Sequence, residues 1–293
     1  MVMSTVKTGK PLPMEEYVQE LALMPPDGTP FRYCPGCGLG MAQSAIMRAF
    51  KILDLDPDRT LTIGGSGCYA VMGHYFKSSH HHGRHGRACA VATGAKMANP
   101  DLTVITLQGD GDCLAIGGNH FIQAARRNVD ITVLMFNNFN YGETGGQNGP
   151  TTPPWTYTET TPYGMPEGAF DPCKLAIAAG ATFVARTTVF HAWQLTRLVV
   201  DAISHKGFAF VEILQNCHEL WGKRNGMGSA TEMLLWFRDN SVQAGAVSRM
   251  APEALAEKFV IGVLHRCERP EMVTEYQKVI DMAQGKQRAG SGR

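Results

Sequence analysis

Residues 102–112, LTVITLQGDGD, decide the fold class of this chain. The stretch begins as a nearly continuous apolar run, turns directly into two Gly-Asp pairs, and is followed by a helical pattern. Continuous apolar runs of this length are typical of strands that are buried on both faces, as in a parallel sheet. Glycines at the strand end let the backbone turn tightly and approach a ligand. The stretch therefore predicts a buried strand that ends in a binding loop.

The same alternation of apolar runs and helical patterns continues along the chain. The β-prone runs lie at residues 61–63, 102–107, 131–136, 182–185 and 208–214. Segments with helical spacing of apolar residues lie at 39–53, 87–98, 118–126, 171–179 and 191–205. Because strands and helices alternate, the sequence predicts an α/β fold with a doubly wound, mostly parallel sheet and helices on both faces.

Composition divides the chain into four regions. Residues 1–32, rich in Pro and Met, predict an arm that lies over a neighbouring surface or partner. Residues 33–230 carry the α/β pattern, residues 231–284 predict a C-terminal helical extension, and residues 285–293 predict a disordered tail. Within the α/β region, residues 138–170 are dense in Gly, Pro, Thr and Tyr, and a loop of that length is usually functional.

Charge and hydropathy exclude several classes of function. The formal charge of +1 and the scattered basic residues argue against nucleic-acid binding. No run approaches the roughly 20 apolar residues of a membrane span, and the N-terminus lacks the apolar core of a signal peptide. We therefore expect a cytoplasmic protein without a membrane partner. In that reducing compartment the eight cysteines indicate metal or redox chemistry rather than disulfides.

Oxygen-bearing side chains follow two strands that are one helical crossover apart. Asp110 follows the strand at 102–107, and Asn137, Asn138 and Asn140 crowd the end of the next strand. Either group alone is most simply a turn or a loop cap. Adjacent parallel strands would bring both groups to one edge of the sheet, where such oxygens suit Mg²⁺ and a phosphate. Together they favour a magnesium-bound diphosphate site.

Other phosphate motifs fit less well. The chain has no Gly-x4-Gly-Lys-Ser/Thr run, which excludes a P-loop. Gly65, Gly67 and Ala70 match a dinucleotide-binding pattern after the strand at 61–63, but no acidic residue follows about 20 positions later to bind a ribose. A nicotinamide site remains a weaker alternative.

The cysteines fall into two groups. Those that occupy predicted element ends, where loops can converge, are Cys34, Cys37, Cys68 and Cys217. Four such thiolates suit either structural zinc or an iron–sulfur cluster, and their spacing does not decide between these two. The others lie among apolar residues and predict core packing: Cys89, Cys113, Cys173 and Cys267. The run His80 to His82 could bind metal or phosphate, although a solvated loop is the simpler prediction.

Seven motifs occur in an order that resembles a known family. They are Cys34-Pro-Gly-Cys-Gly38, Gly65-Ser-Gly-Cys68, His85-Gly-Arg87, Ala92-Thr-Gly-Ala95, Gly109-Asp-Gly-Asp112, Gly117-Gly-Asn-His120 and residues 137–147. In this order they resemble the thiamine-diphosphate-binding beta subunits of 2-oxoacid:ferredoxin oxidoreductases, most closely the 2-oxoglutarate type. The resemblance implies the thiamine-diphosphate-binding variant of the doubly wound fold.

The resemblance also implies the site residues. The ligands of a [4Fe-4S] cluster would be Cys34, Cys37, Cys68 and Cys217. Mg²⁺ would be held by Asp110, the Asn138 side chain and the Asn140 carbonyl. Residues that would meet the diphosphate or line its loop are Gly111, Asp112, Gly142 and Glu143. Residues that would face the thiamine and its surroundings are Ser66, Gly67, Cys68, Tyr69 and His85, and His85 is the one candidate for catalysis.

The implied reaction is oxidative decarboxylation of a 2-oxo acid, with coenzyme A as acyl acceptor and electrons leaving through the cluster to ferredoxin. 2-Oxoglutarate is the expected substrate, in either direction, and pyruvate or another 2-oxo acid is the alternative. No glutamate for thiamine activation is evident in this chain. In the family it comes from an alpha subunit, so an alpha–beta heterodimer that pairs into a tetramer is implied. A non-redox thiamine-diphosphate lyase subunit with structural zinc is the competing hypothesis.

Overall fold

The computed structural model describes residues 32–255 and 257–285. The predicted N-terminal arm falls, apart from Arg32, outside the described residues. The predicted tail also lies outside them beyond Gly285. Both remain predictions. Within the described residues, no helix combines the length and apolar character required to cross a membrane.

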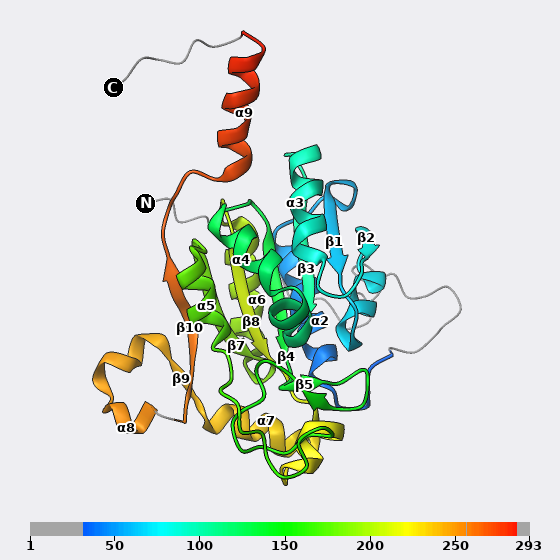
Figure 1. Cartoon of the computed structure of the whole chain (residues 1–293), viewed down its shortest axis with the longest axis vertical. Coiled ribbons are helices and arrows are strands. Elements are labelled where there is room, and N and C mark those ends of the chain that lie inside the picture. The colour runs from blue at the N-terminus through cyan, green and yellow to red at the C-terminus, as the bar shows by residue number, and fades with distance from the viewer. Residues whose placement is uncertain (1–31, 256, 286–293) are drawn as a thin grey trace.

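A single eight-stranded sheet forms the centre of the molecule (Figure 1). In spatial order its strands are β2 (Ser79–His82), β1 (Thr60–Gly64), β3 (Thr103–Gly109), β4 (Thr132–Asn137), β8 (Ala209–Leu214), β7 (Phe183–Thr188), β10 (Phe259–Arg266) and β9 (Ser241–Gln243). Every pairing from β2 to β7 is parallel. Strand β10 is antiparallel to β7 and parallel to β9. The predicted mostly parallel sheet is confirmed.

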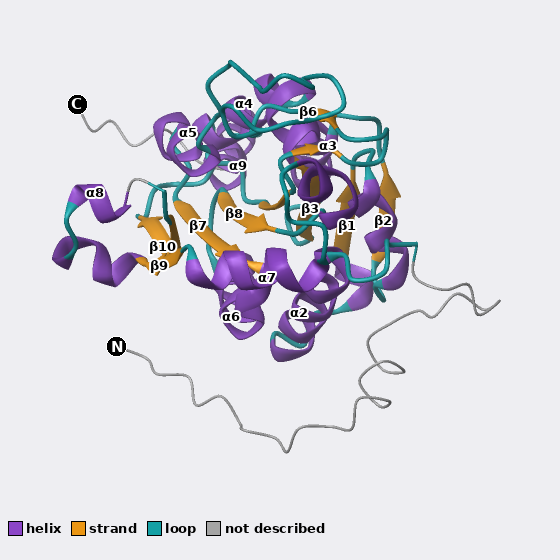
Figure 2. Ribbon diagram, turned by 90° about the horizontal axis from the view of Figure 1, so that it is seen from below, coloured by secondary structure: helices purple, strands orange, loops and turns teal. Residues whose placement is uncertain are grey.

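Helices cover both faces of the sheet (Figure 2). One face carries α2 (Gly38–Ile52) and α6 (Ala192–Ser204), and the other carries α3 (Ala88–Ala98), α4 (Gly118–Arg126) and α5 (Pro172–Ala179). These five helices coincide with the five predicted ones. The doubly wound arrangement is therefore confirmed.

Alternate residues of the central strands enter opposite cores. On β4, Leu134 and Phe136 pack with α2 and α6, whereas Val133 and Met135 pack with α3 and α4. Because successive side chains of a strand point to opposite faces, burial on both faces favours apolar residues at most positions. This preference explains the nearly continuous apolar runs in the sequence.

Short helical turns connect these elements. They are η1 (Pro57–Arg59), η2 (Cys68–Tyr75), η3 (Gly111–Ile116), η4 (Val189–His191), η5 (His218–Gly222) and η6 (Ala244–Arg249). The long segment 138–170 contains a small hairpin of β5 (Asn140–Tyr141) and β6 (Gln147–Asn148) and otherwise has no regular structure. The prediction of a long loop at this position is confirmed.

The C-terminal extension is not purely helical, which corrects the prediction for residues 231–284. It contains the helices α7 (Ala230–Asp239), α8 (Pro252–Leu255) and α9 (Met272–Ala283), but also β9 and β10. Strand β10 extends the main sheet beyond β7. Its residues alternate irregularly between buried and exposed, so its pattern lacks the continuous apolar character of the central strands.

Two smaller predictions also need correction. Residues 80–82 are not a loop but belong to the edge strand β2. Cys267, expected in the core, is only partly buried, whereas Cys89, Cys113 and Cys173 are buried as predicted.

Candidate functional site

The site lies at the carboxyl ends of β1, β3, β4 and β8, where each strand passes into a loop. A cavity of about 270 Å³ opens there. Every residue that was expected to bind Mg²⁺ or the organic cofactor lines this cavity. They are Ser66, Gly67, Cys68, Tyr69, His85, Asp110, Gly111, Asp112, Asn138, Asn140, Gly142 and Glu143. The topology thus brings together residues that lie up to 77 positions apart in sequence, from Ser66 to Glu143.

Asp110 follows β3 directly and is buried, with 3% of its surface exposed. Its Oδ2 accepts a hydrogen bond from Thr151 Oγ1 at 2.6 Å. Among the described residues, no basic side chain forms an ion pair with it. Burial raises the pKa of Asp110 to about 7, although the Thr151 hydrogen bond acts in the opposite direction. The carboxylate is therefore placed where a negative charge is costly unless a cation accompanies it.

The amide of Asn138 supports the same conclusion. In one orientation its oxygen accepts a hydrogen bond from the Asn140 N–H at 3.3 Å and lies 2.6 Å from the Asn140 carbonyl oxygen and 3.3 Å from Asp110 Oδ1. In the other orientation the NH₂ group would donate to both oxygens. Ligand oxygens around Mg²⁺ lie about 3 Å apart, because the metal–oxygen distance is about 2.1 Å. The second orientation satisfies both oxygens without a metal, and in the first these three groups have the chemistry to hold Mg²⁺.

Asp112 has a different role from Asp110. Its Oδ1 accepts a hydrogen bond from the Gly86 N–H at 2.6 Å, and its Oδ2 accepts one from Gln108 Nε2 at 3.0 Å. The same Oδ1 lies 3.2 Å from Nδ1 of His85. A side chain at Gly65 would collide with this carboxylate, since a Cβ there would lie 2.3 Å from Oδ1. Asp112 therefore binds the loop after β2 and positions His85 at the cavity.

Tyr69 packs against the loop that follows β1 and carries Cys68. Its hydroxyl donates to the Ser66 carbonyl at 3.0 Å, and its ring stacks on Phe136 at 6.0 Å between centroids. Gly67 has a φ of 150°, a conformation that strongly favours glycine, and a Cβ there would lie 2.7 Å from the Tyr69 ring. The glycine allows the loop that carries Cys68 to fold tightly over this ring.

The four cysteines at element ends converge on a second cavity. This cavity has a volume of about 200 Å³, and its wall includes Cys34, Cys37, Cys68 and Cys217. Cys37 occupies the N-cap position of α2, where the helix dipole favours negative charge. The chain separates the first and last of these cysteines by 183 positions, and the fold brings them to one place.

The four sulfur atoms are not gathered as closely as the ligands of a single metal ion. In the described part of the chain, no three of these sulfurs lie within 4.8 Å of one another. Thiolates on one Zn²⁺ would lie about 3.8 Å apart, given zinc–sulfur distances of about 2.3 Å. Burial raises the pKa of Cys37 to about 11 and, with the neighbouring sulfurs, that of Cys217 above its ordinary value. Burial thus favours the neutral form of the Cys37 and Cys217 thiols.

One wall is common to both cavities. It includes Cys68, Gly142 and Glu143, which line the first cavity and the second. Burial and then the adjacent Glu143 carboxylate raise the pKa of the Cys68 thiol well above its ordinary value. A Cβ on Gly142 would approach the Cys68 sulfur to 3.5 Å, so the β5 hairpin lies against this cysteine. The oxygen site and the sulfur site are thus direct neighbours.

Sequence reasoning missed three side chains of the site. Thr151 binds Asp110, Tyr141 lines the first cavity, and Gln215 accepts a hydrogen bond from the Cys37 thiol at 3.6 Å. Thr151 and Tyr141 belong to the long loop, where no periodicity marks individual positions. Gln215 directly follows β8, and its place at a strand end was the available signal.

Comparisons with known proteins agree with this geometry. The family described as "Thiamine pyrophosphate enzyme, C-terminal TPP binding domain" matches residues 65–213. The 2-oxoglutarate synthase subunit KorB of Methanocaldococcus jannaschii is 41% identical over 261 residues, which cover 89% of this chain and 97% of that protein. The chain belongs to the beta subunits of the 2-oxoacid:ferredoxin oxidoreductases. It is therefore part of a thiamine-diphosphate-dependent oxidoreductase.

Other members of the family are similar to this beta subunit. Subunit beta of 2-oxoacid:ferredoxin oxidoreductase 2 from Aeropyrum pernix is 46% identical over 64% of this chain and 60% of its own length. The 2-oxoglutarate:ferredoxin oxidoreductase of Magnetococcus marinus, solved with 2-oxoglutarate, coenzyme A and succinyl-CoA bound, superposes with a TM-score of 0.78. Its sequence is 32% identical, and the match covers 90% of each chain.

Proposed function

We propose that this beta subunit acts in the coenzyme A-dependent oxidative decarboxylation of 2-oxoglutarate to succinyl-CoA, or in the reverse reductive carboxylation, with ferredoxin as electron partner. The observation that carries the proposal is the common wall of the two cavities. It places an oxygen-lined site that fits Mg²⁺ beside a four-cysteine site. The names of the similar proteins from Methanocaldococcus jannaschii and Magnetococcus marinus support 2-oxoglutarate as the substrate.

Mg²⁺ would be held by Asp110, Asn138 Oδ1 and the Asn140 carbonyl. The Gly111 backbone would face the diphosphate at the start of η3, where a Cβ would lie 2.1 Å from the Tyr141 ring. Bound thiamine diphosphate supplies a carbon nucleophile for the keto group of the substrate. This chain's own residues would anchor and orient that cofactor through the metal and the tight loops.

His85 would orient groups at the open side of the cavity. Its Nδ1 lies 3.0 Å from the Ser66 carbonyl oxygen and 3.2 Å from Asp112 Oδ1. Both neighbours are acceptors, so Nδ1 carries the proton and donates it to them. The ring is thereby fixed, and Nε2 is left to meet the substrate or the cofactor.

The cysteines would hold a [4Fe-4S] cluster, which supplies one-electron transfer when bound. A cluster is favoured over a single Zn²⁺ because, among the described residues, no three of these sulfurs lie within 4.8 Å of one another. The competing proposal, a non-redox thiamine-diphosphate lyase subunit with structural zinc, requires sulfurs that close to about 3.8 Å. The spacing therefore disfavours it.

An alpha subunit would complete the site. The similar proteins are named as beta subunits, which implies a partner. Support in this chain comes from exposed aromatic side chains on the loop beside the cavity. They are Trp155, Tyr157, Tyr163 and Phe170, and Tyr163 is 94% exposed. Clusters of exposed aromatic residues are typical of protein–protein interfaces.

The proposal is tested by separating the two cofactors in one pair of variants. The chain is purified anaerobically with its partner subunit, and iron, sulfide, zinc and thiamine diphosphate are quantified in one sample. About four iron atoms and one thiamine diphosphate per chain are expected. Cys217→Ser should lose iron and keep thiamine diphosphate, whereas Asp110→Asn should keep iron and lose thiamine diphosphate affinity by more than about 100-fold.

Two matched controls accompany these variants. Cys267→Ser changes a cysteine that lines neither cavity, and Asp101→Asn changes an exposed aspartate before β3. Both should retain iron and thiamine diphosphate. Zinc in place of iron would support the lyase, and unchanged thiamine diphosphate binding by Asp110→Asn would contradict the magnesium site. Carbon dioxide release from 2-oxoglutarate and from pyruvate, with coenzyme A and a one-electron acceptor, then decides the substrate.

A further inference from the structure

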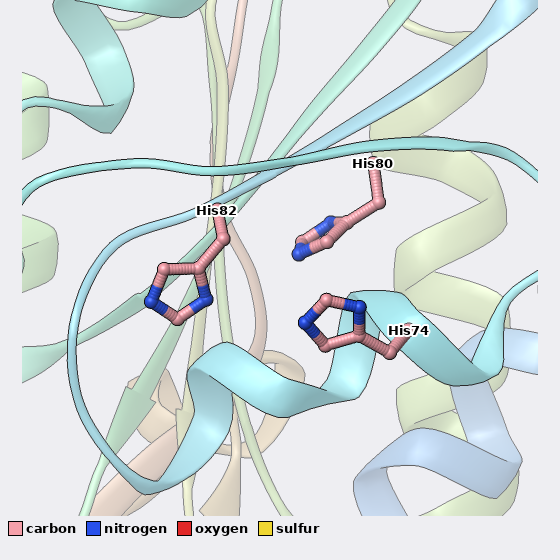
Figure 3. Close-up of side chains that lie close together, drawn as sticks. All are labelled: His74, His80 and His82. Atoms are coloured by element: carbon pink, nitrogen blue, oxygen red, sulfur yellow. The ribbon is translucent and has the colours of Figure 1, made fainter. Parts of the chain in front are cut away.

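Three histidines gather outside the site described above. His74 comes from η2, and His80 and His82 come from the edge strand β2 (Figure 3). One ligand nitrogen from each ring lies within 4.8 Å of the corresponding nitrogens of the other two. The rings of His74 and His80 are 4.8 Å apart between centroids. The three imidazoles therefore face one small volume from two separate elements.

Thr62 orients the ring of His80 through its Nδ1 atom. Its hydroxyl donates to the Ser79 carbonyl at 3.3 Å and lies 3.0 Å from Nδ1 of His80. When the hydroxyl proton is directed to the Ser79 carbonyl, Nδ1 is the donor of the second bond. The lone pair of His80 then resides on Nε2. Metal-binding histidines are held in the same way, by a hydrogen bond at the other ring nitrogen.

The free nitrogen of His80 has no partner. Nε2 is buried and forms no hydrogen bond within the described residues. The ring lies directly on Gly73, where a Cβ would approach Nδ1 to 2.0 Å, so the backbone leaves space for this ring alone. A buried, unpaired nitrogen that faces two further imidazoles is suited to bind a metal ion.

The remaining two ligands leave the site accessible. His74 and His82 are exposed, which gives an ion a path from solvent. Nitrogen ligands on Zn²⁺ lie about 3.4 Å apart, because zinc–nitrogen distances are about 2.0–2.1 Å. Small rotations of the two exposed side chains reach this spacing from the present one.

We propose that His74, His80 and His82 bind one Zn²⁺ ion, with a fourth position open to water. Three neutral imidazoles are a common donor set for this ion. The ion would join η2 to the edge strand, and the segment so closed runs from His74 to His82, between the cavity residues Cys68 and His85. It would thus stabilise both loops that enter the cofactor cavity, and its binding does not depend on the identity of the substrate.

Zinc titration of the whole complex tests this proposal. The beta subunit, with its partner and its cysteine site loaded, is equilibrated with Zn²⁺ and the bound metal is measured by mass spectrometry. The wild type should bind one Zn²⁺ per chain more than the double variant His74→Gln/His82→Gln. His81→Gln is the matched control, because His81 lies on the same strand with its ring on the opposite face, and it should bind zinc as the wild type does. Both altered side chains of the double variant are exposed, so folding is not at issue.

A second variant tests whether the Thr62 hydroxyl orients His80. Thr62→Val removes the hydroxyl that fixes His80 and should weaken Zn²⁺ binding by about 10–100-fold. Zn²⁺ should also raise the thermal unfolding midpoint of the wild type and of His81→Gln but not that of the double variant. Equal zinc content in the wild type and the double variant would overturn the proposal, whether both bind the ion or neither does.

Discussion

Two buried acids near the centre of the sheet differ in how their negative charge is compensated. Glu212 on β8 is 1% exposed, and its Oε2 accepts a hydrogen bond from Arg186 Nε at 2.6 Å. Arg186 also pairs with Asp171 at 2.6 Å. Asp110 is 3% exposed and forms no ion pair with any described residue. The charge of Glu212 is compensated within the chain, and that of Asp110 has no counter-ion among the described residues.

The two acids are nevertheless connected. Asn137 donates from Nδ2 to Glu212 Oε1 at 2.8 Å, and its Oδ1 lies 2.9 Å from Thr151 Oγ1. The same Thr151 hydroxyl lies 2.6 Å from Asp110 Oδ2. Glu212, whose charge is compensated by Arg186, thus orients Asn137 and Thr151 beside Asp110. A closed ion pair provides rigidity, and an uncompensated carboxylate provides binding energy for a cation.

The largest effect on stability is expected from breaking the Arg186–Glu212 ion pair. Arg186→Met leaves Glu212 buried without a counter-ion and should lower the free energy of unfolding by about 3–5 kcal/mol. Urea denaturation at neutral pH measures this loss. Adding Glu212→Gln to the same chain removes the unpaired charge and should restore part of the stability. A loss below about 1 kcal/mol would mean that water already reaches Glu212.

An intermediate effect is expected at the connection between the two acids. Thr151→Val keeps the volume of the side chain and removes the hydroxyl between Asp110 and Asn137. Thiamine diphosphate and Mg²⁺ should bind about 10–100-fold more weakly, because the groups around a metal ligand orient it. Isothermal titration measures the affinity. Thr156→Val, on the same loop with its hydroxyl bound to the Pro153 carbonyl, is the control and should leave cofactor binding unchanged.

The smallest effect is on the outer partner of Arg186. Burial alone would raise the pKa of Asp171, but Arg186 and the Lys174 N–H outweigh it and hold that pKa below its ordinary value of 3.8. The folded state then binds fewer protons than the unfolded state, so this stabilisation is complete above pH 3.8 and is lost as the pH falls through the lower folded-state value.

Asp171→Asn isolates this contribution. The asparagine retains the N-cap of α5, where Asp171 accepts hydrogen bonds from the Cys173 and Lys174 N–H groups, and loses only the charge. It should cost about 1 kcal/mol at neutral pH. Urea midpoints of the variant and the wild type should approach one another below pH 3.8. A difference that does not change with pH would show that the charge of Asp171 contributes nothing.

The sequence was most informative where burial is uniform. Strand β4 is buried at every position, and its mainly apolar run can be recognised without knowledge of its neighbours. Asp110 and Asn138 could be predicted as partners because each follows such a strand, and parallel neighbours align their ends. The fold class and the core of the cofactor cavity follow from these local signals.

The remaining features depend on contacts that local patterns do not record. Thr151 reaches Asp110 across 41 positions of sequence from a loop without a period. Strand β10 is only half buried, so its apolar and exposed residues do not alternate regularly. The spacing of the four cysteines leaves zinc and iron–sulfur ligation open, because the distance between sulfurs is a property of the folded chain.

The two outermost strands have a consequence for solubility. An open sheet exposes unpaired N–H and C=O groups at its edges, which can pair with another chain and start aggregation. Here the sheet ends in β2, of four residues, and in β9, of three residues. Three of the four side chains on β2 are histidines, and the short β9 is followed at once by η6. Neither border offers a long, apolar template, so the sheet is protected against growth by the addition of further strands.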